Sequence, residues 1–219
     1  MKLRPRRLVA HGLRSILCAL SLASCTITID HGIPLYTVGN YPQHQKIGLK
    51  VALQLSDELR QTKWQRKALD GTTWVIPLGE HLAHNAESVA KKLLSEVVVM
   101  QRVTPDASQD RVDAILTPKV LYVQQTYPMS GGSGVVLAIA IEWTLKSLDG
   151  ETVWVDTVNG EGRSSAGNAF TMGARAQERT RAIMDDLFQK SFEAIASAQA
   201  IKEFAGRRNR GADLGGPGT

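Results

Sequence analysis

The stretch GVVLAIAIEWTLKSLDGETVWVDTV, residues 134–158, decides the fold. Its apolar run from Val135 to Ile141 is typical of a buried β-strand. Asp149-Gly150 then marks a tight turn, and a second β-like run follows from Thr152 to Val158. The stretch therefore predicts two antiparallel strands, over 134–145 and 152–158, joined as a hairpin.

The length of the turn sets which side chains share a face of this hairpin. A two-residue loop would pair Leu145 with Trp154 and move the valines of the second strand off the apolar face. A three-residue loop, Leu148-Asp149-Gly150 with a left-handed Gly150, pairs Leu145 with Val153 instead. We prefer the three-residue loop because it collects on one face Ile139, Ile141, Trp143, Leu145, Val153 and Val155.

Other segments supply the rest of the fold. Alternation over Ile47–Leu55 predicts a strand, and a short second strand is expected over 72–76. Apolar residues at helical spacing from Leu82 to Val97 predict an amphipathic helix, and a longer one is expected over 171–198. A further strand is expected over 112–124, where Pro118 indicates an edge position or a bulge.

These elements follow the order β-β-α-β-β-β-α. We expect an α+β fold, a two-layer sandwich whose mostly antiparallel sheet carries two helices on one face. The domain is predicted to span residues 47–205, followed by a disordered tail over 206–219 that is rich in glycine and arginine. Before it, a polar segment interrupted by Pro34, Gly39 and Pro42 is predicted to be a tether able to extend about 70 Å. Two short β-like pieces within it, Ile27–Ile29 and Leu35–Val38, are candidates for pairing with the edge of the domain.

The formal net charge of +5 comes from the N-terminus. Residues 1–24 hold five of the 26 basic residues and none of the 21 acidic ones, so the rest of the chain is formally neutral. That balance argues against a basic nucleic-acid-binding domain. The basic stretch, the short apolar run Ile16–Leu22 and the small residues after it have the anatomy of a secretory signal peptide over 1–24, too short to span a bilayer as an anchor.

The leader ends in Leu22-Ala23-Ser24-Cys25, which resembles the lipobox of bacterial lipoproteins. The resemblance implies that the Cys25 thiol receives diacylglycerol, that the leader is cut before Cys25, and that the new amino group gains an N-acyl chain. Two or more acyl chains suffice for stable membrane anchoring. Residues 25–46 would then be the lipidated cysteine and its tether. Thr26 differs from the aspartate that retains enterobacterial lipoproteins in the inner membrane, which implies the outer membrane, with the domain facing the periplasm.

Cysteine usage agrees with lipidation. The chain has two cysteines, and Cys18 lies in the segment that would be removed. A plain exported protein with Cys25 as a single free thiol would be unusual. No cofactor is expected beyond the acyl chains on Cys25.

Trp64 is the main candidate for a contact with a partner, because it lies among Lys63, Arg66 and Lys67 in a polar segment. An exposed tryptophan beside cations is typical of interface hot spots. The alternative is that Trp64 packs at the edge of the sheet. The glycine-rich loop over 131–134 is a second candidate contact.

Motifs for catalysis are weak. His81 and His84 lie three apart but lack the further ligands of a metal site, so we interpret them as solvated residues on the polar face of the helix. The loop over 131–134 is neither a P-loop nor a nucleophile elbow. Ser164-Ser165 and Asp185-Asp186 have no partner histidine at a telling spacing.

The order of elements in an exported chain resembles the N-terminal domain of TolB, the penicillin-binding-protein activator LpoB and YajG-type lipoproteins. The function we favour is a non-catalytic interaction or accessory module that docks a protein partner in the cell envelope. An envelope hydrolase with a dispersed active site, and an accessory to a lipid or polysaccharide transport machine, remain alternatives. The oligomeric state is left open.

Overall fold

The computed structural model describes residues 28–30, 32–67, 69, 71–101, 112–126, 134–165 and 172–214, so the leader, Cys25 and the loop over 131–133 lie outside the described residues. The strands are β1 (Thr28–Asp30), β2 (Ile47–Gln54), β3 (Lys63–Lys67), β4 (Thr73–Pro77), β5 (Leu94–Met100), β6 (Ala114–Thr126), β7 (Gly134–Ser147) and β8 (Thr152–Ser165). The helices are α1 (Asp57–Arg60), α2 (Gly79–Leu93), α4 (Met172–Ser197) and α5 (Gln199–Leu214).

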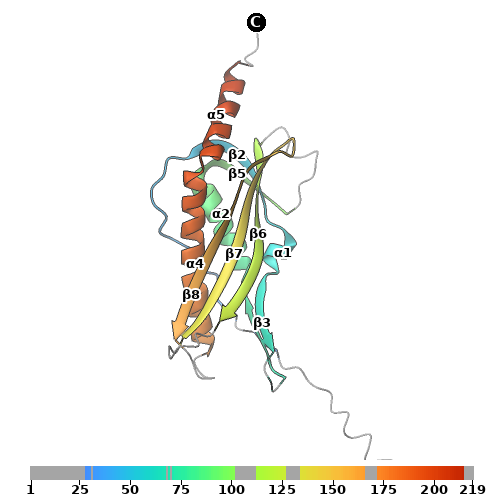
Figure 1. The fold of residues 1–219 in the computed structure, drawn as a ribbon, viewed down its shortest axis with the longest axis vertical. Coiled ribbons are helices and arrows are strands. Elements are labelled where there is room, and N and C mark those ends of the chain that lie inside the picture. The colour runs from blue at the N-terminus through green and yellow to red at the C-terminus, as the bar shows by residue number, and fades with distance from the viewer. Residues whose placement is uncertain are drawn as a thin grey trace, which may run out of the picture.

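The main sheet has five strands in the order β5-β2-β6-β7-β8. Its two long ladders, β6–β7 and β7–β8, are antiparallel, whereas the short ladders of β2 with β5 and with β6 are parallel. Figure 1 shows α4 lying along this sheet, with α2 beside it. The predicted α+β class, with helices covering one face of a mostly antiparallel sheet, is confirmed.

A second, smaller sheet was not predicted. It has the order β1-β4-β3 and contains the strand expected over 72–76, which we had placed in a single sheet. Strand β1 overlaps the β-like piece over 27–29, and its pairing with the domain is confirmed at Thr28–Asp30. Strand β3 comes from a segment predicted to be a polar connection.

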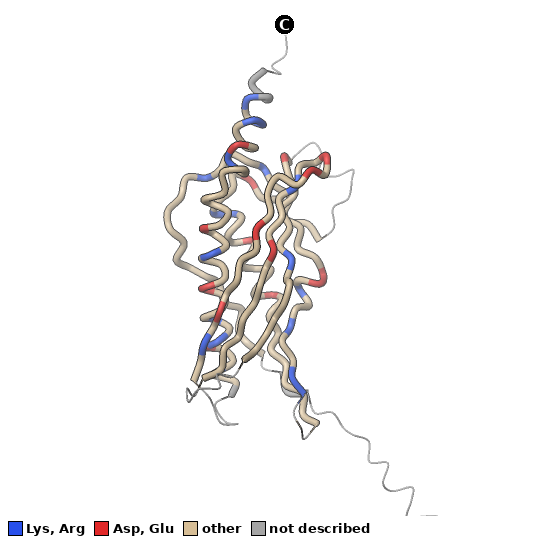
Figure 2. Tube along the Cα trace, in the orientation of Figure 1, with Lys and Arg blue, Asp and Glu red and all other residues tan. Residues whose placement is uncertain are grey.

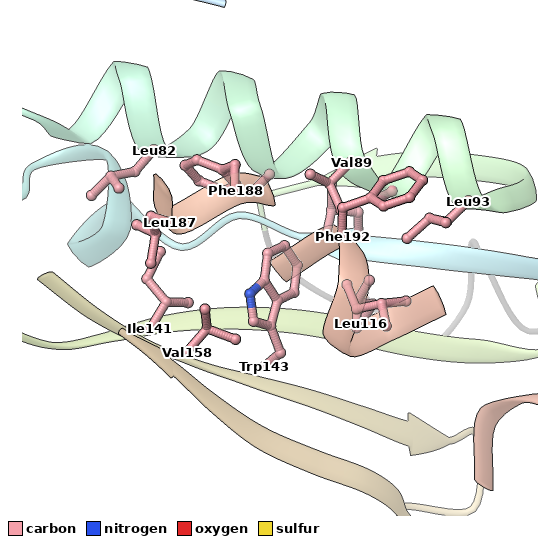
Figure 3. Close-up of a cluster of buried hydrophobic side chains, with 14 of the residues drawn as sticks. Leu82, Val89, Leu93, Leu116, Ile141, Trp143, Val158, Leu187, Phe188 and Phe192 are labelled. Carbon is pink, nitrogen blue, oxygen red and sulfur yellow. The ribbon is translucent and has the colours of Figure 1, made fainter. Parts of the chain in front are cut away.

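The core lies between the main sheet and the two long helices. Leu82, Val89 and Leu93 of α2 meet Leu187, Phe188 and Phe192 of α4 over the sheet, where Trp143 is fully buried (Figure 3). The indole Nε1 of Trp143 donates to Ser191 Oγ at 3.0 Å, and this hydroxyl donates to the Leu187 carbonyl at 2.8 Å. The polar atom of the largest core side chain is thus satisfied, which removes the cost of burying it unpaired.

The predicted hairpin has the expected turn but a different register. Ser147 N donates to the Glu151 carbonyl at 2.9 Å, which closes a three-residue loop, and Gly150 is left-handed with φ at 85°. A bulge then follows, because Lys146 pairs with Thr152 but Leu145 pairs with Trp154. The predicted pairs of Leu145 with Val153 and of Trp143 with Val155 are therefore wrong, and Val155 is 53% exposed.

Strand β8 continues to Ser165, beyond the predicted end at Val158, and α4 lies very close to this added part. A Cβ on Gly160 would come within 2.5 Å of Leu187 Cβ, and one on Gly162 within 2.3 Å of the Arg179 carbonyl oxygen. No side chain fits at either position. The glycines are therefore required by the helix–sheet contact and do not end the strand.

Two helix boundaries also differ from prediction. The helix expected to reach Val97 ends at Leu93, and Leu94 begins β5 directly, in keeping with the β-branched run over 97–99. The tail predicted to be disordered from residue 206 is helical through Leu214 as part of α5. Buried Ile201 and Phe204 hold this helix on the domain, and the Arg207 and Arg208 guanidinium groups lie 5.9 and 5.4 Å from the Phe204 ring centre.

Candidate functional site

The four candidate contact residues lie on β3, an edge strand of the small sheet. Lys63, Arg66 and Lys67 are exposed. Trp64 is half-buried, opposite the buried Ile76, and packs against the hydrophobic core. The structure thus groups the three cations on one exposed strand and turns the tryptophan toward the domain, as the edge-packing interpretation of Trp64 expects.

An exposed apolar side chain, which the sequence analysis missed, lies in the turn after β3. β3 and β4 form an antiparallel hairpin in which Lys67 pairs with Thr73, and Leu69 in the connection is fully exposed. Gly71 is left-handed there, with φ at 87°. The Asp70-Gly71 pair between two β-like runs was the signal that could have predicted this hairpin.

The first described strand, β1, runs parallel to β4. Thr28 pairs with Thr73, Ile29 with Trp74 and Asp30 with Val75. Since Thr73 is the first residue of β4 after the turn, the chain enters β1 beside that turn. Thr28, the first residue of β1, therefore lies beside the tip of the β3–β4 hairpin.

The hairpin and helix α5 lie at opposite ends of an elongated molecule (Figure 1). Figure 2 shows basic residues along the hairpin and a separate basic cluster on α5 at the far end. Lys63 and Lys67 form no ion pair within the described ranges. The hairpin is thus a basic, exposed projection of an otherwise balanced domain.

The predicted tether is not free after residue 32. We call residues 33–41 the strap, because they are fastened to α2 and α4. Asn85 of α2 accepts from Val38 N at 2.7 Å and donates to the Tyr36 carbonyl at 2.8 Å. Val38 itself is 2% exposed. The prediction of a solvated tether is wrong here, since the strap forms a third layer outside the helices.

The two histidines of α2 help to hold the strap. His81 is 3% exposed, and its Nδ1 accepts from Tyr36 N at 3.1 Å. His84 Nε2 lies 2.7 Å from Thr37 Oγ1. The interpretation of His81 as a solvated residue is therefore wrong. Burial lowers the pKa of His81, which favours the neutral ring that can accept this hydrogen bond.

Tyrosines fasten the strap to α4. Tyr36 Oη donates to both carboxylate oxygens of Asp185, at 2.8 and 2.9 Å, and the Arg181 guanidinium lies 5.7 Å from the Tyr36 ring centre. Burial, followed by the hydrogen bond to Asp185, raises the pKa of Tyr36. Tyr41 stacks on Phe192 with ring centres 5.1 Å apart. These contacts give Asp185 a structural role.

The remaining polar candidates also have structural partners. Ser164 Oγ accepts from the buried Arg179 at 2.8 Å, and Asp186 accepts from Glu161 N at 2.8 Å. Among the residues that the structure describes, no three His, Cys, Asp or Glu side chains come together as metal ligands. These contacts supply no nucleophile with an adjacent general base.

An open groove of about 440 Å³ lies between α5 and the start of β2. It is lined by His44, Gln45, Lys46, Ile47, Gly48, Lys202, Ala205, Gly206 and Asn209. This lining contains no carboxylate, hydroxyl or thiol side chain, and its ionisable groups are those of His44, Lys46 and Lys202. Over the described part of the chain, no helix is both long and apolar enough to cross a bilayer.

No family model matches the sequence, and no curated protein sequence matches it. Its fold is similar in outline to several solved structures. A Xanthomonas campestris protein of the DUF330 family is 12% identical, with a TM-score of 0.47, and the match covers 84% of this chain and 99% of that one. A minor lipoprotein from Acinetobacter baumannii is 12% identical, with a TM-score of 0.45, over 69% of this chain and 94% of that one.

PelC from Paraburkholderia phytofirmans, crystallised as a dodecamer, is a further structure of similar outline. It is 14% identical, with a TM-score of 0.39, and the match covers 74% of this chain and 96% of that one. At these TM-scores the function has to be argued from the residues of the chain itself.

Proposed function

We propose that this chain is a lipoprotein of the bacterial cell envelope, anchored to the outer membrane by acyl chains on Cys25, with its folded domain in the periplasm. The domain acts as a non-catalytic interaction module. Its candidate contact surface is the β3–β4 hairpin, where Lys63, Arg66 and Lys67 are exposed on an edge strand.

The lipobox is the observation that carries this proposal. Leu22-Ala23-Ser24-Cys25 ends a leader that has five cations, no acidic residue and a short apolar run. Acyl chains on Cys25 hold the chain at a bilayer, because each buried methylene contributes about 0.8 kcal/mol. The described structure supports the contact role, because three exposed cations lie together on the hairpin, whereas Ser164, Asp185 and Asp186 have structural partners.

Metabolic labelling with an alkyne fatty acid in a Gram-negative host tests the anchor. Cys25→Ser should abolish labelling and leave an uncleaved precursor, whereas the matched control Cys18→Ser should label like the wild type. Equal labelling of the Cys25→Ser chain and the wild type would reject the proposal.

Membrane fractionation tests the sorting. The wild type should sediment with the outer membrane, and Thr26→Asp should move it to the inner membrane. Inner-membrane location of the wild type would reject the outer-membrane part of the proposal while leaving lipidation intact.

Cross-linking in intact envelopes tests the interaction role. A protein that cross-links to the wild type and is lost with Cys25→Ser would be the expected partner. Turnover of an envelope substrate by the purified domain would contradict the non-catalytic role.

A further inference from the structure

The β3–β4 hairpin brings together three features, one of which comes from a distant part of the sequence. Its turn exposes Leu69, its edge strand carries three exposed cations, and the chain enters β1 beside that same turn through the pairing of Thr28 with Thr73. The last feature matters because Cys25 lies just upstream of β1.

The distance from Cys25 to the hairpin is short. Only Thr26 and Ile27 separate Cys25 from Thr28, so the two Cα atoms are at most about 11 Å apart. The strap cannot lengthen this connection, because it follows β1 in the chain. A domain anchored through Cys25 is therefore held with the tip of the hairpin at the bilayer surface.

The chemistry of the hairpin suits that position. Residues 63–77 contain three basic residues and one acidic residue, Asp70. Lysine and arginine near an anionic bilayer strengthen membrane attachment, by about fivefold in affinity for each cation. An exposed leucine can insert at the boundary between headgroups and acyl chains, where its apolar surface leaves water.

The other basic cluster does not fit this role. Arg207 and Arg208 lie on α5 at the opposite end of the molecule, against the Phe204 ring. An anchor that reaches about 11 Å from Thr28 holds the hairpin at the surface, but it does not hold α5 there. The geometry of the anchor thus selects the hairpin.

We propose that the β3–β4 hairpin docks on the anionic phospholipid headgroups of the membrane that holds Cys25. Leu69 enters the interface, and Lys63, Arg66 and Lys67 lie against lipid phosphates. This inference rests on the proposed lipidation, and it assigns the contact surface to lipid instead of a protein. The docked hairpin points the long axis of the domain away from the bilayer, with α5 farthest out.

The test uses the full chain, processed and lipidated in cells, then reconstituted in vesicles. Leu69→Cys supplies a thiol for an environment-sensitive fluorophore, and Asp149→Cys, in the exposed β7–β8 turn at the opposite end, is the matched control. In vesicles containing phosphatidylglycerol, spin-labelled lipids should quench the Leu69→Cys probe at least threefold more than the Asp149→Cys probe. In pure phosphatidylcholine this difference should shrink.

Charge reversal then tests whether the cations bind the headgroups or whether the anchor alone keeps the hairpin near the bilayer. Lys63→Glu with Lys67→Glu should reduce the docked fraction of the Leu69→Cys probe at least tenfold in the anionic vesicles. Lys146→Glu with Lys202→Glu, two exposed lysines away from the hairpin, changes the net charge equally and should have little effect. Unchanged thermal unfolding of both pairs excludes loss of fold as the cause.

Each negative outcome has a separate meaning. A chain without fatty acid on Cys25 fails the proposed function. A lipidated chain whose two probes are quenched equally overturns the docking proposal alone. Shielding of the Leu69→Cys probe in cell envelopes but not in anionic vesicles also overturns it, and identifies a protein as the contact.

Discussion

The two sheets of this molecule differ in what their side chains do. The five-stranded sheet is closed on one face by α2 and α4, and α4 packs so tightly that Gly160 and Gly162 have no room for a Cβ. The small sheet packs only partly on the core and projects a hairpin with exposed cations and an exposed Leu69. The five-stranded sheet therefore supplies stability, and the small sheet supplies the exposed contact surface. Substitutions in one sheet should leave the role of the other intact.

The strongest test of this separation is a charge in the closed layer. Leu93 on α2 is fully buried, so Leu93→Asp would place an unpaired carboxylate in the core. We expect a loss of about 4 kcal/mol or more in the free energy of unfolding, enough to unfold the domain. Lys92→Asp, on the exposed neighbouring position, should stay within about 0.5 kcal/mol of wild type. Similar denaturant midpoints for the two variants would contradict the described packing of α2.

The glycine contact of β8 with α4 gives the next largest effect. Gly162→Ala puts a methyl group against the Arg179 carbonyl and should destabilise by about 2 kcal/mol through overpacking. Gly39→Ala is the matched control, because no heavy atom lies within 4 Å of its added Cβ. Thermal unfolding of both variants measures the difference. A wild-type melting temperature for Gly162→Ala would show that α4 lies farther from β8.

Substitution of Trp64 tests whether this residue belongs to the packed core or to the exposed contact surface of the hairpin. Its half-buried side chain packs on the core, so Trp64→Ala should cost about 1.5 kcal/mol, less than the 3–5 kcal/mol typical of a fully buried tryptophan. Lys63→Ala, on the adjacent exposed position, should change stability by less than about 0.5 kcal/mol. If Trp64→Ala kept the wild-type melting temperature but lost cross-linked envelope proteins, the hot-spot interpretation of Trp64 would replace the packing one.

The smallest effect concerns the strap and pH. The pKa of His81 is lower in the folded protein than in the unfolded chain, so the unfolded state binds more protons. Stability from this group is therefore full above the ordinary histidine pKa and falls as the pH drops toward the lowered value. Melting temperatures between pH 7.5 and pH 5 should fall more steeply for the wild type than for His81→Phe. Identical slopes would show that the Tyr36 N–H does not depend on a neutral His81.

Local patterns predicted the elements that bury a regular stripe. The apolar residues over 47–55 and 171–198 match β2 and α4, because their spacing follows the strand or helix period. Such spacing predicts the element whichever residues pack against it. Residues 159–165 look like a polar, glycine-containing loop, yet they are part of β8. Gly160 and Gly162 are needed there because α4, which comes later in the chain, leaves no room for a side chain. Such long-range causes leave no local signal.

The sequence predicted which residues make up the candidate site but not how the fold arranges them. The sequence shows that Lys63, Arg66 and Lys67 are clustered, but not that β3 is an edge strand or that Thr28 enters beside its turn. For the strap, the β-like piece over 35–38 indicated a contact with the domain but not its partners, because the segment has prolines and no period. These partners are single side chains of α2 and α4, which no spacing rule identifies.

The pairing of β1 with β4 also determines how the domain would respond to mechanical force. The proposed lipid anchor would pull on the chain at Thr28, along the axis of a strand bonded to β4 over three residues. Tension in that direction shears the backbone hydrogen bonds of β1 together instead of peeling them one at a time. Beyond β1 the same tension would reach the strap and its bonds to α2 before it reached β2. Movement of the envelope would thus strain β1 and the strap first and spare the core.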